Sequence, residues 1–222
     1  MKFILAALHT ESVRTWLDHF CAPDPGFLHN TIHSLYFDTP ALESLHEKLN
    51  SEYLKRKLRL RWYTHETEGS LSEKAFLEIK RKEGHRSLKK RYALSIDTAL
   101  LQNDPIRAGG NLDLSSIVSG EEYALVRNMI PFCVIRYLRH RYIDMASGFR
   151  VSLDHSIGIT HANDRFQVPG GPGHLTWSVL EIKGPSASGL PRMLHGLQAF
   201  NLVKTSFSKY AECVNHLLLG KN

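Results

Sequence analysis

Apolar and polar residues alternate over several short stretches of this chain, as they do in a β-strand that has one buried and one wet face. Between Lys57 and Trp62 the odd-numbered positions are Lys, Arg and Arg, whereas the even-numbered positions are Leu, Leu and Trp. The same alternation recurs around Glu78, Arg139, Arg150 and Glu181. The pattern therefore predicts strands with one apolar face and one charged, mostly basic face.

Eight strands are predicted in this way. They are a first strand within Met1–Leu8, then Thr31–Phe37, Lys55–Tyr63, Ala75–Lys82, Leu88–Leu94, Val134–Ile143, Phe149–Leu153 and Trp177–Lys183. Helical spacing predicts four helices: Thr10–Phe20, one opened by Thr39 and Pro40, one over about Glu121–Met129 ended by Pro131, and one after Pro191. The segments Asn103–Asn111, His161–His174 and Gly184–Pro191 have the composition of loops, and none is a convincing linker. We expect one α+β domain over residues 1–222.

Two architectures can accommodate the charged strand faces. An open sheet could display them to nucleic acid, or the sheet could close into a barrel with a charged interior and an apolar outer face covered by helices. Closure removes exposed sheet edges, and the apolar faces need cover. We therefore favour an eight-stranded antiparallel barrel around a basic tunnel, flanked by helices. Nucleic acid is not expected as a partner, because Trp62 lies on the apolar face and leaves few aromatic residues for base stacking.

Composition and charge narrow the classes of partner. The chain of 222 residues is 42% hydrophobic with 15 Gly and 9 Pro, which excludes collagen-like and wholly disordered proteins. Its net charge of +6 is concentrated between Lys55 and Arg91, where thirteen basic residues and five Glu give a local +8. The rest of the chain therefore has a net charge of −2. This distribution indicates an anionic partner.

Cysteine usage and hydropathy indicate a compartment. Cys21, Cys133 and Cys213 are far apart and odd in number, which argues against a disulfide framework or a zinc site. No apolar run approaches the roughly 20 residues of a membrane span. We expect a cytoplasmic protein without a membrane span in this chain.

Two carboxylates share the charged faces with the cations. Glu78 and Glu181 both occur in the sequence Leu-Glu-Ile-Lys and would point to the same side as the basic residues. They could form internal ion pairs with Lys80 and Lys183, or hold Mg²⁺ or Mn²⁺, which take oxygen ligands from one or two carboxylates plus phosphate. The two roles are compatible.

Seven motifs in order resemble a known family. They are Ser34-Leu35-Tyr36-Phe37-Asp38-Thr39, Lys57-Leu58-Arg59-Leu60-Arg61, Leu77-Glu78-Ile79-Lys80, Tyr137-Leu138-Arg139, Arg150-Val151-Ser152-Leu153-Asp154, Leu180-Glu181-Ile182-Lys183 and Phe207-Ser208-Lys209-Tyr210. Together they resemble the VTC (vacuolar transporter chaperone) polyphosphate polymerase domain, a triphosphate tunnel metalloenzyme related to the CYTH proteins. The resemblance implies a basic tunnel that binds ATP, inorganic triphosphate or polyphosphate with Mn²⁺ or Mg²⁺.

The resemblance and the strand pattern together name the candidate site. Lys80, Arg139 and Arg150 are the expected catalytic cations, and Glu181 and Glu78 are the expected metal ligands. The expected phosphate-binding residues are Lys2, Lys57, Arg59, Arg61, Lys82, Lys89, Arg91, Arg141, Lys183 and Lys209.

The chain departs from the family pattern at two tunnel-end positions. The Arg and Glu that usually precede the Lys of the first strand do not occur before Lys2, so either they are absent or the start of the chain is trimmed. Ser206 stands where a second Lys is common. The expected function is phosphoryl transfer from ATP to polyphosphate, or hydrolysis of a triphosphate. The alternative is a non-catalytic module that binds polyphosphate or nucleotide.

Overall fold

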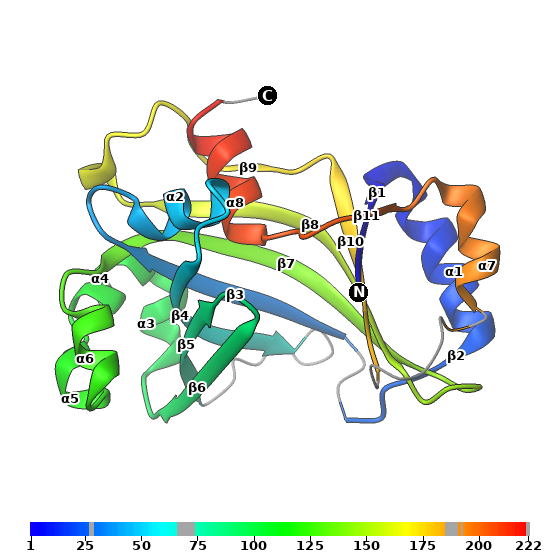
Figure 1. The fold of residues 1–222 in the computed structure, drawn as a ribbon, viewed down its shortest axis with the longest axis horizontal. Helices are drawn as coiled ribbons and strands as arrows, with labels where there is room; N and C mark the ends of the chain where they lie inside the picture. Colours follow the sequence, from blue (N-terminus) through cyan, green and yellow to red (C-terminus); the bar gives the residue numbers. More distant parts are fainter. Residues whose placement is uncertain (27–28, 66–73, 185–190, 192, 221–222) are drawn as a thin grey trace.

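The fold is built on one large antiparallel sheet. The computed structural model describes residues 1–26, 29–65, 74–184, 191 and 193–220. The strands run in the order β11-β1-β10-β8-β7-β3-β4-β5-β6, with β2 beside β7 and β9 beside β8 (Figure 1). Their bounds are β1 Lys2–Ala6, β2 Cys21–Pro23, β3 His29–Asp38, β4 Leu54–His65, β5 Ala75–Glu83, β6 Arg86–Leu94, β7 Ile130–Asp144, β8 Arg150–Ala162, β9 Gly173–His174, β10 Trp177–Lys183 and β11 Val203–Lys204.

The predicted strands are all present, but the closed barrel is not. Among the described residues the sheet ends at β6 on one side and at β11 on the other, with no pairing between them. The sheet is curved instead of closed. Its curvature brings Arg91 of β6 and Glu181 of β10 to the lining of the same cleft. We call the side that carries Arg59, Glu78, Arg139 and Glu181 the inner face.

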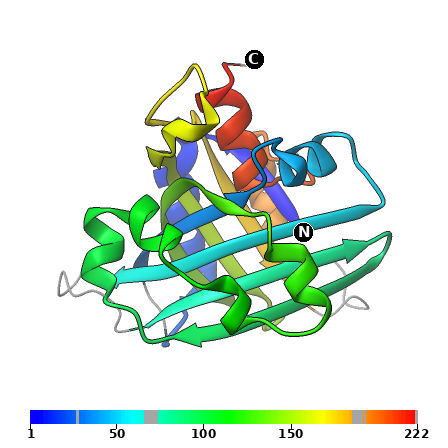
Figure 2. The same ribbon diagram turned by 90° about the vertical axis from the view of Figure 1, so that its left-hand side faces the viewer.

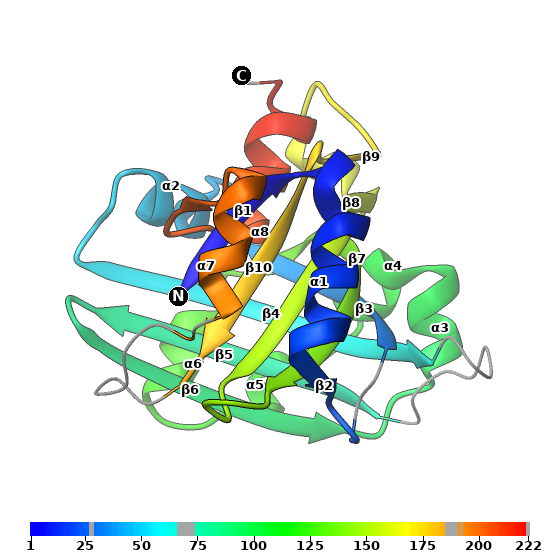
Figure 3. The same ribbon diagram turned by 90° about the vertical axis from the view of Figure 1, so that its right-hand side faces the viewer.

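Two groups of helices cover the outer face, as the apolar strand positions require. The helices α3 to α6 cover β3, β4 and β5, where Leu101, Val118 and Val126 pack with Leu60 and Leu77 (Figure 2). Helices α1 and α7 cover the opposite end of the sheet (Figure 3). The α-helix bounds are α1 Thr10–Phe20, α2 Glu43–Leu49, α3 Thr98–Asn103, α4 Pro105–Gly110, α5 Leu114–Ile117, α6 Glu121–Val126, α7 Met193–Leu197 and α8 Lys209–Cys213. Three short 3₁₀ helices, η1 Ala7–His9, η2 Asp164–Phe166 and η3 Gln198–Phe200, and the π-helix η4 Val214–Leu218 complete the helical elements.

The C-terminal helices α8 and η4 pack on the inner face and were not predicted. Tyr210, Val214 and Leu218 are buried there against inner-face residues such as Ile135 and Val179. The hydroxyl of Tyr210 donates a hydrogen bond to the carboxylate of Asp38, which is also buried. Part of the inner face is therefore apolar and filled by α8 and η4, so the charged surface is shorter than the predicted tunnel.

A register shift in β8 separates the charged and apolar parts of the inner face. Leu138 pairs with His155 and Arg136 pairs with Gly158, so one residue of β7 faces two residues of β8. Such a bulge inserts an extra residue, here at Ser156, which has φ 50°. It allows Ile157 to point to the same face as Asp154.

Local backbone chemistry corrects three of the predicted boundaries. The helix expected from Pro40 begins at Glu43, because Leu42 is left-handed and Asp38 and Thr39 accept hydrogen bonds from the first backbone N–H groups. Pro131 lies inside β7, after α6 has ended at Val126. The loop expected over Asn103–Asn111 contains α4, which Asp104 caps.

The other two segments with loop composition are Gly184–Pro191 and His161–His174. Most of Gly184–Pro191 lies outside the described residues, whereas His161–His174 contains the end of β8, η2 and β9. In the described parts of the chain, no helix is long and apolar enough to cross a membrane.

Candidate functional site

Strand register brings the predicted basic residues together on the inner face. Arg59 of β4 lies opposite Glu78 of β5 and Tyr36 of β3. Arg139 of β7 lies opposite Asp154 of β8. Because directly opposed side chains in antiparallel strands interact, each arginine is placed beside a carboxylate.

Four cations surround Glu78, whose side chain is only 4% exposed. Arg59 and Arg61 lie 2.6 and 3.6 Å from its Oε2 atom, and Lys89 and Arg91 lie 3.4 and 3.6 Å from its Oε1 atom. We call these five residues the Glu78 cluster. Burial acts to raise the pKa of Glu78, but the charges of Arg59, Arg61 and Lys89 outweigh it and lower the pKa to about 2.

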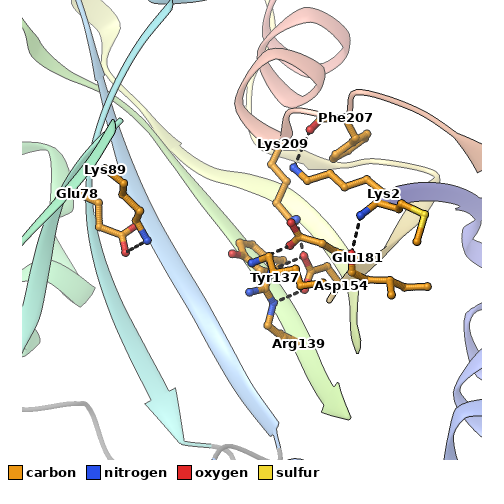
Figure 4. A network of polar contacts seen from close by, with 12 residues as sticks. Lys2, Glu78, Lys89, Tyr137, Arg139, Asp154, Glu181, Phe207 and Lys209 are labelled. Carbon is orange, nitrogen blue, oxygen red and sulfur yellow. Dashed lines mark hydrogen bonds and ion pairs between the residues drawn. The ribbon is translucent and has the colours of Figure 1, made fainter. Parts of the chain in front are cut away.

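A second buried carboxylate, Asp154, organises the neighbouring part of the inner face (Figure 4). Nε and Nη2 of Arg139 donate to its two oxygens at 2.5 and 2.7 Å, and Nζ of Lys209 donates at 2.5 Å. We call Tyr137, Arg139, Asp154 and Lys209 the Asp154 cluster. Arg139 and Lys209 hold the pKa of Asp154 well below its usual range, although burial alone would raise it.

Three lysines extend the positive charge toward the start of α8. Nζ of Lys57 donates to Ser208 at 2.8 Å, and Nζ of Lys2 donates to the backbone oxygen of Phe207 at 3.0 Å. Burial and the charges of Arg59, Lys2 and Lys80 lower the pKa of Lys57 to about 7. The pKa values of Lys2 and Lys80 are also lowered, mainly by burial. Burial is thus the main cause of these lowered pKa values, and neighbouring cations add to it.

The phenol of Tyr137 lies among the cations of both clusters. Nη2 of Arg61 donates to its oxygen at 3.4 Å, and Nζ of Lys209 lies 4.6 Å from the ring centroid. Burial acts to raise the pKa of Tyr137, but Arg61, Arg139 and Lys209 lower it to about 8. The pKa of Tyr137 therefore depends on the positive charge of both clusters.

A cleft of ≈ 560 Å³ opens beside the clusters at one end of the inner face. Its basic lining comes from four strands: β6, β7, β8 and β10. The lining includes Arg91, Arg139, Arg141, Arg150, Glu181 and Lys183, together with the aromatic residues Tyr63 and Phe76. The guanidinium of Arg91 lies 3.6 Å from the centroid of the Phe76 ring. The cleft therefore combines an aromatic wall with cations.

Glu181 fits a metal ligand better than Glu78 does. Nζ of Lys183 forms an ion pair with Oε2 of Glu181 at 3.7 Å, and the side chain of Glu181 is 18% exposed at the cleft. Lys183, Lys2 and Arg139 lower the pKa of Glu181 against the effect of burial, so the carboxylate is charged. No group of three or more His, Cys, Asp and Glu side chains suited to a metal occurs in the described part of the chain. Mn²⁺ or Mg²⁺ at Glu181 would therefore take its other ligands from water or phosphate oxygens.

Most predicted site residues lie in the two clusters, the lysine group or the cleft. The Glu78 cluster contains Arg59, Arg61, Glu78, Lys89 and Arg91, the Asp154 cluster contains Arg139 and Lys209, and the lysine group is Lys2, Lys57 and Lys80. Arg141, Arg150, Glu181 and Lys183 line the cleft. Lys82 is exposed, and its charge contributes to the lowered pKa of Lys80.

Sequence reasoning did not select several residues that organise this site. Asp154 and Tyr137 have the same strand parity as Arg139, so the alternation itself could have found them. Tyr36, which accepts a hydrogen bond from Nη1 of Arg59 at 3.2 Å, lies on β3, where polar and apolar residues do not alternate clearly, so its strand gave no such signal.

Comparison with known proteins identifies the family. The family model for the VTC domain matches residues 1–218. A Bacillus halodurans protein, provisionally described as an adenylate cyclase, has a similar structure, with 14% identity and a TM-score of 0.54 over 94% of this chain and 91% of that chain. A Vibrio parahaemolyticus protein with the same description has 11% identity and a TM-score of 0.46 over 96% of both chains. A comparison with curated proteins gives no match. The family model spans nearly the whole sequence, and the chain therefore belongs to the VTC domain family.

Proposed function

We propose that the inner face binds a triphosphate or polyphosphate chain and that the protein catalyses phosphoryl transfer from ATP to polyphosphate, or hydrolysis of a triphosphate. The observation that carries this proposal is the convergence of cations from β4, β6, β7 and α8 around two buried carboxylates, next to a cleft with further arginines. Guanidinium groups match phosphate oxygens, and a dense cationic surface favours an anion of high charge density.

The cleft supports a nucleotide as the donor. Tyr63 and Phe76 line its wall, with the Arg91 guanidinium over the Phe76 ring, and aromatic side chains stack bases with little sequence preference. A base placed there would direct its phosphates toward Arg139, which lines the cleft and also belongs to the Asp154 cluster.

The residues of the inner face would act by positioning and charge. Phosphoryl transfer requires cations around the transferred group more than covalent chemistry from the protein. Arg139 and Arg150 would bind non-bridging oxygens, and Lys80 would neutralise charge from β5. Glu181 would hold Mn²⁺ or Mg²⁺ together with the substrate, and the bound ion would neutralise phosphate charge.

A binding experiment tests the first part of the proposal. Arg150→Met removes an exposed cation of the cleft and should weaken triphosphate binding by about tenfold or more. Arg136→Met is the matched control, because Arg136 lies on β7 opposite His33 and points away from the inner face. Equal affinities of the two variants would contradict the assignment of the cleft.

A turnover experiment tests the second part. The protein is incubated with ATP, Mn²⁺ and a pyrophosphate or triphosphate primer, and phosphate release and chain growth are followed separately. Chain growth would identify a polymerase, and release alone would identify a hydrolase. Binding without turnover would support the alternative, a non-catalytic binding module, in which Glu78 and Asp154 serve only as ion-pair partners.

A further inference from the structure

The guanidinium groups of Arg59 and Arg61 have a protein partner at each nitrogen. Nε and Nη2 of Arg59 contact Glu78 at 2.8 and 2.6 Å, and its Nη1 contacts Tyr36. In Arg61, Nε donates to Ser34 at 3.3 Å, Nη2 donates to Tyr137, and Nη1 faces Glu78 at 3.6 Å. A phosphate oxygen that approaches either guanidinium therefore competes with Glu78 for its N–H groups.

The other two cations of the Glu78 cluster are open to solvent. The side chains of Lys89 and Arg91 are 56% and 44% exposed, and they face the second carboxylate oxygen at 3.4 and 3.6 Å. An incoming anion would meet these two residues first, because the side chains of Arg59 and Arg61 are only 22% and 10% exposed (Figure 4 shows Glu78 with Lys89).

Without the carboxylate, four like charges would face one another across β4, β5 and β6. Like charges opposed in a sheet are destabilising, and the effect is stronger for partly buried groups. Glu78 therefore stabilises the free protein by neutralising part of this charge. An anionic ligand would do the same from the solvent side.

We propose that Glu78 is an internal competitor of the phosphate ligand, whose carboxylate and the incoming phosphate oxygens bind the same four cations. This inference rests on the proposed function, because it requires a phosphate ligand on the inner face. It gives Glu78 a role different from that of a metal ligand, since an ion bound at its oxygens would meet four positive charges.

The two roles predict opposite effects of one substitution. Glu78→Gln keeps the shape of the side chain but removes its charge, so metal-free binding of inorganic triphosphate should become about tenfold tighter or more. The free protein should unfold at a lower temperature, and triphosphate should raise the unfolding temperature more than in the wild type. A metal-ligand role instead predicts unchanged or weaker binding.

Glu83→Gln provides a matched control. Glu83 lies on the same strand but points to the opposite face, where it pairs with Arg81 at 2.9 Å. The change of net charge is identical, so Glu83→Gln should leave triphosphate affinity unchanged. If both variants gained affinity equally, a general charge effect would replace the competition.

The measurement is calorimetric titration of inorganic triphosphate in the presence of a chelator, together with thermal unfolding. Should Glu78→Gln fail to fold, Glu78→Asp keeps the buried charge with a shorter reach and should also bind more tightly than the wild type. Tighter binding by either variant supports the inference. If the wild type binds triphosphate and neither variant binds more tightly, the inference is wrong; if no form binds, the proposed function fails with it.

Discussion

The ammonium group of Lys209, at the start of α8, lies 2.5 Å from the carboxylate of Asp154, a β8 residue with no exposed surface. This contact joins the C-terminal helix to the charged part of the sheet. Since Asp154 also binds Arg139, one carboxylate orients two cations from different elements.

Loss of the Lys209 contact should destabilise the fold. Lys209→Met leaves a buried carboxylate with one cation in place of two, and breaking a buried ion pair in this way costs on the order of 3 kcal/mol. Urea unfolding measures the change, with Lys204→Met, an exposed lysine of β11, as the control. Equal stabilities of the two variants would show that the contact contributes nothing.

Triphosphate binding should take up a proton at Lys57. In the free protein burial and neighbouring cations lower the pKa of Lys57 to about 7, and a bound anion would raise it. The affinity for triphosphate should therefore fall as the pH rises above about 7. The fall should end near the pKa that Lys57 has in the complex, which approaches the unperturbed lysine value of about 10.4. Calorimetry at pH 8 in buffers of different ionisation enthalpy should detect the uptake.

The variant Lys57→Met should lose this proton uptake. Lys55→Met, which removes the same charge two residues earlier on β4, should retain it. Uptake that persists in Lys57→Met would place the titrating group elsewhere.

Tyr137 should provide a spectroscopic signal for ligand binding. Its phenol has a pKa of about 8 because Arg61, Arg139 and Lys209 outweigh burial, so tyrosinate absorbance should appear near pH 9 in the free protein. A bound triphosphate adds negative charge, raises this pKa and should reduce the absorbance. Tyr137→Phe should abolish the signal, whereas Tyr142→Phe should not, because burial raises the pKa of Tyr142. A signal unchanged by triphosphate would place the ligand away from Tyr137.

Glu181 should affect only the metal-dependent part of binding. Glu181→Gln removes the carboxylate of the cleft, so Mn²⁺ should no longer strengthen triphosphate binding, while metal-free affinity should change little. Titrations with Mn²⁺ and with a chelator separate the two contributions. Retention of the full effect of Mn²⁺ would assign the metal to other ligands.

Strand parity predicted the charged faces because it is a local property. The positions of Arg59 and Arg61 on one side of β4 follow from residues two apart, and the structure confirms this arrangement. The contact between Arg139 and Asp154 depends on the register of β7 and β8, which no local pattern gives. The bulge at Ser156 shifts that register only beyond the contact, from Arg136 and Gly158 onward, and has no clear signal in the sequence.

The place of the inner helices could not be predicted in the same way. In α8 and η4 the apolar residues Tyr210, Val214 and Leu218 recur at helical spacing, and the polar Glu212 and Asn215 lie between them. This period is local and could have indicated a helix, but it does not say which face of the sheet the helix covers. The open edges at β6 and β11 likewise depend on pairing between distant strands, which no local pattern describes.

The contacts of Lys2 and Tyr210 have a consequence for the order of folding. Lys2 reaches Phe207 across 205 positions, and Tyr210 reaches Asp38 across 172. Contacts of such long range form slowly, because a large loop must close first. During synthesis the central strands can pair before Phe207 and Lys209 emerge, because these two residues follow them in the chain. Competence to bind phosphate should thus appear only after most of the sheet has already formed.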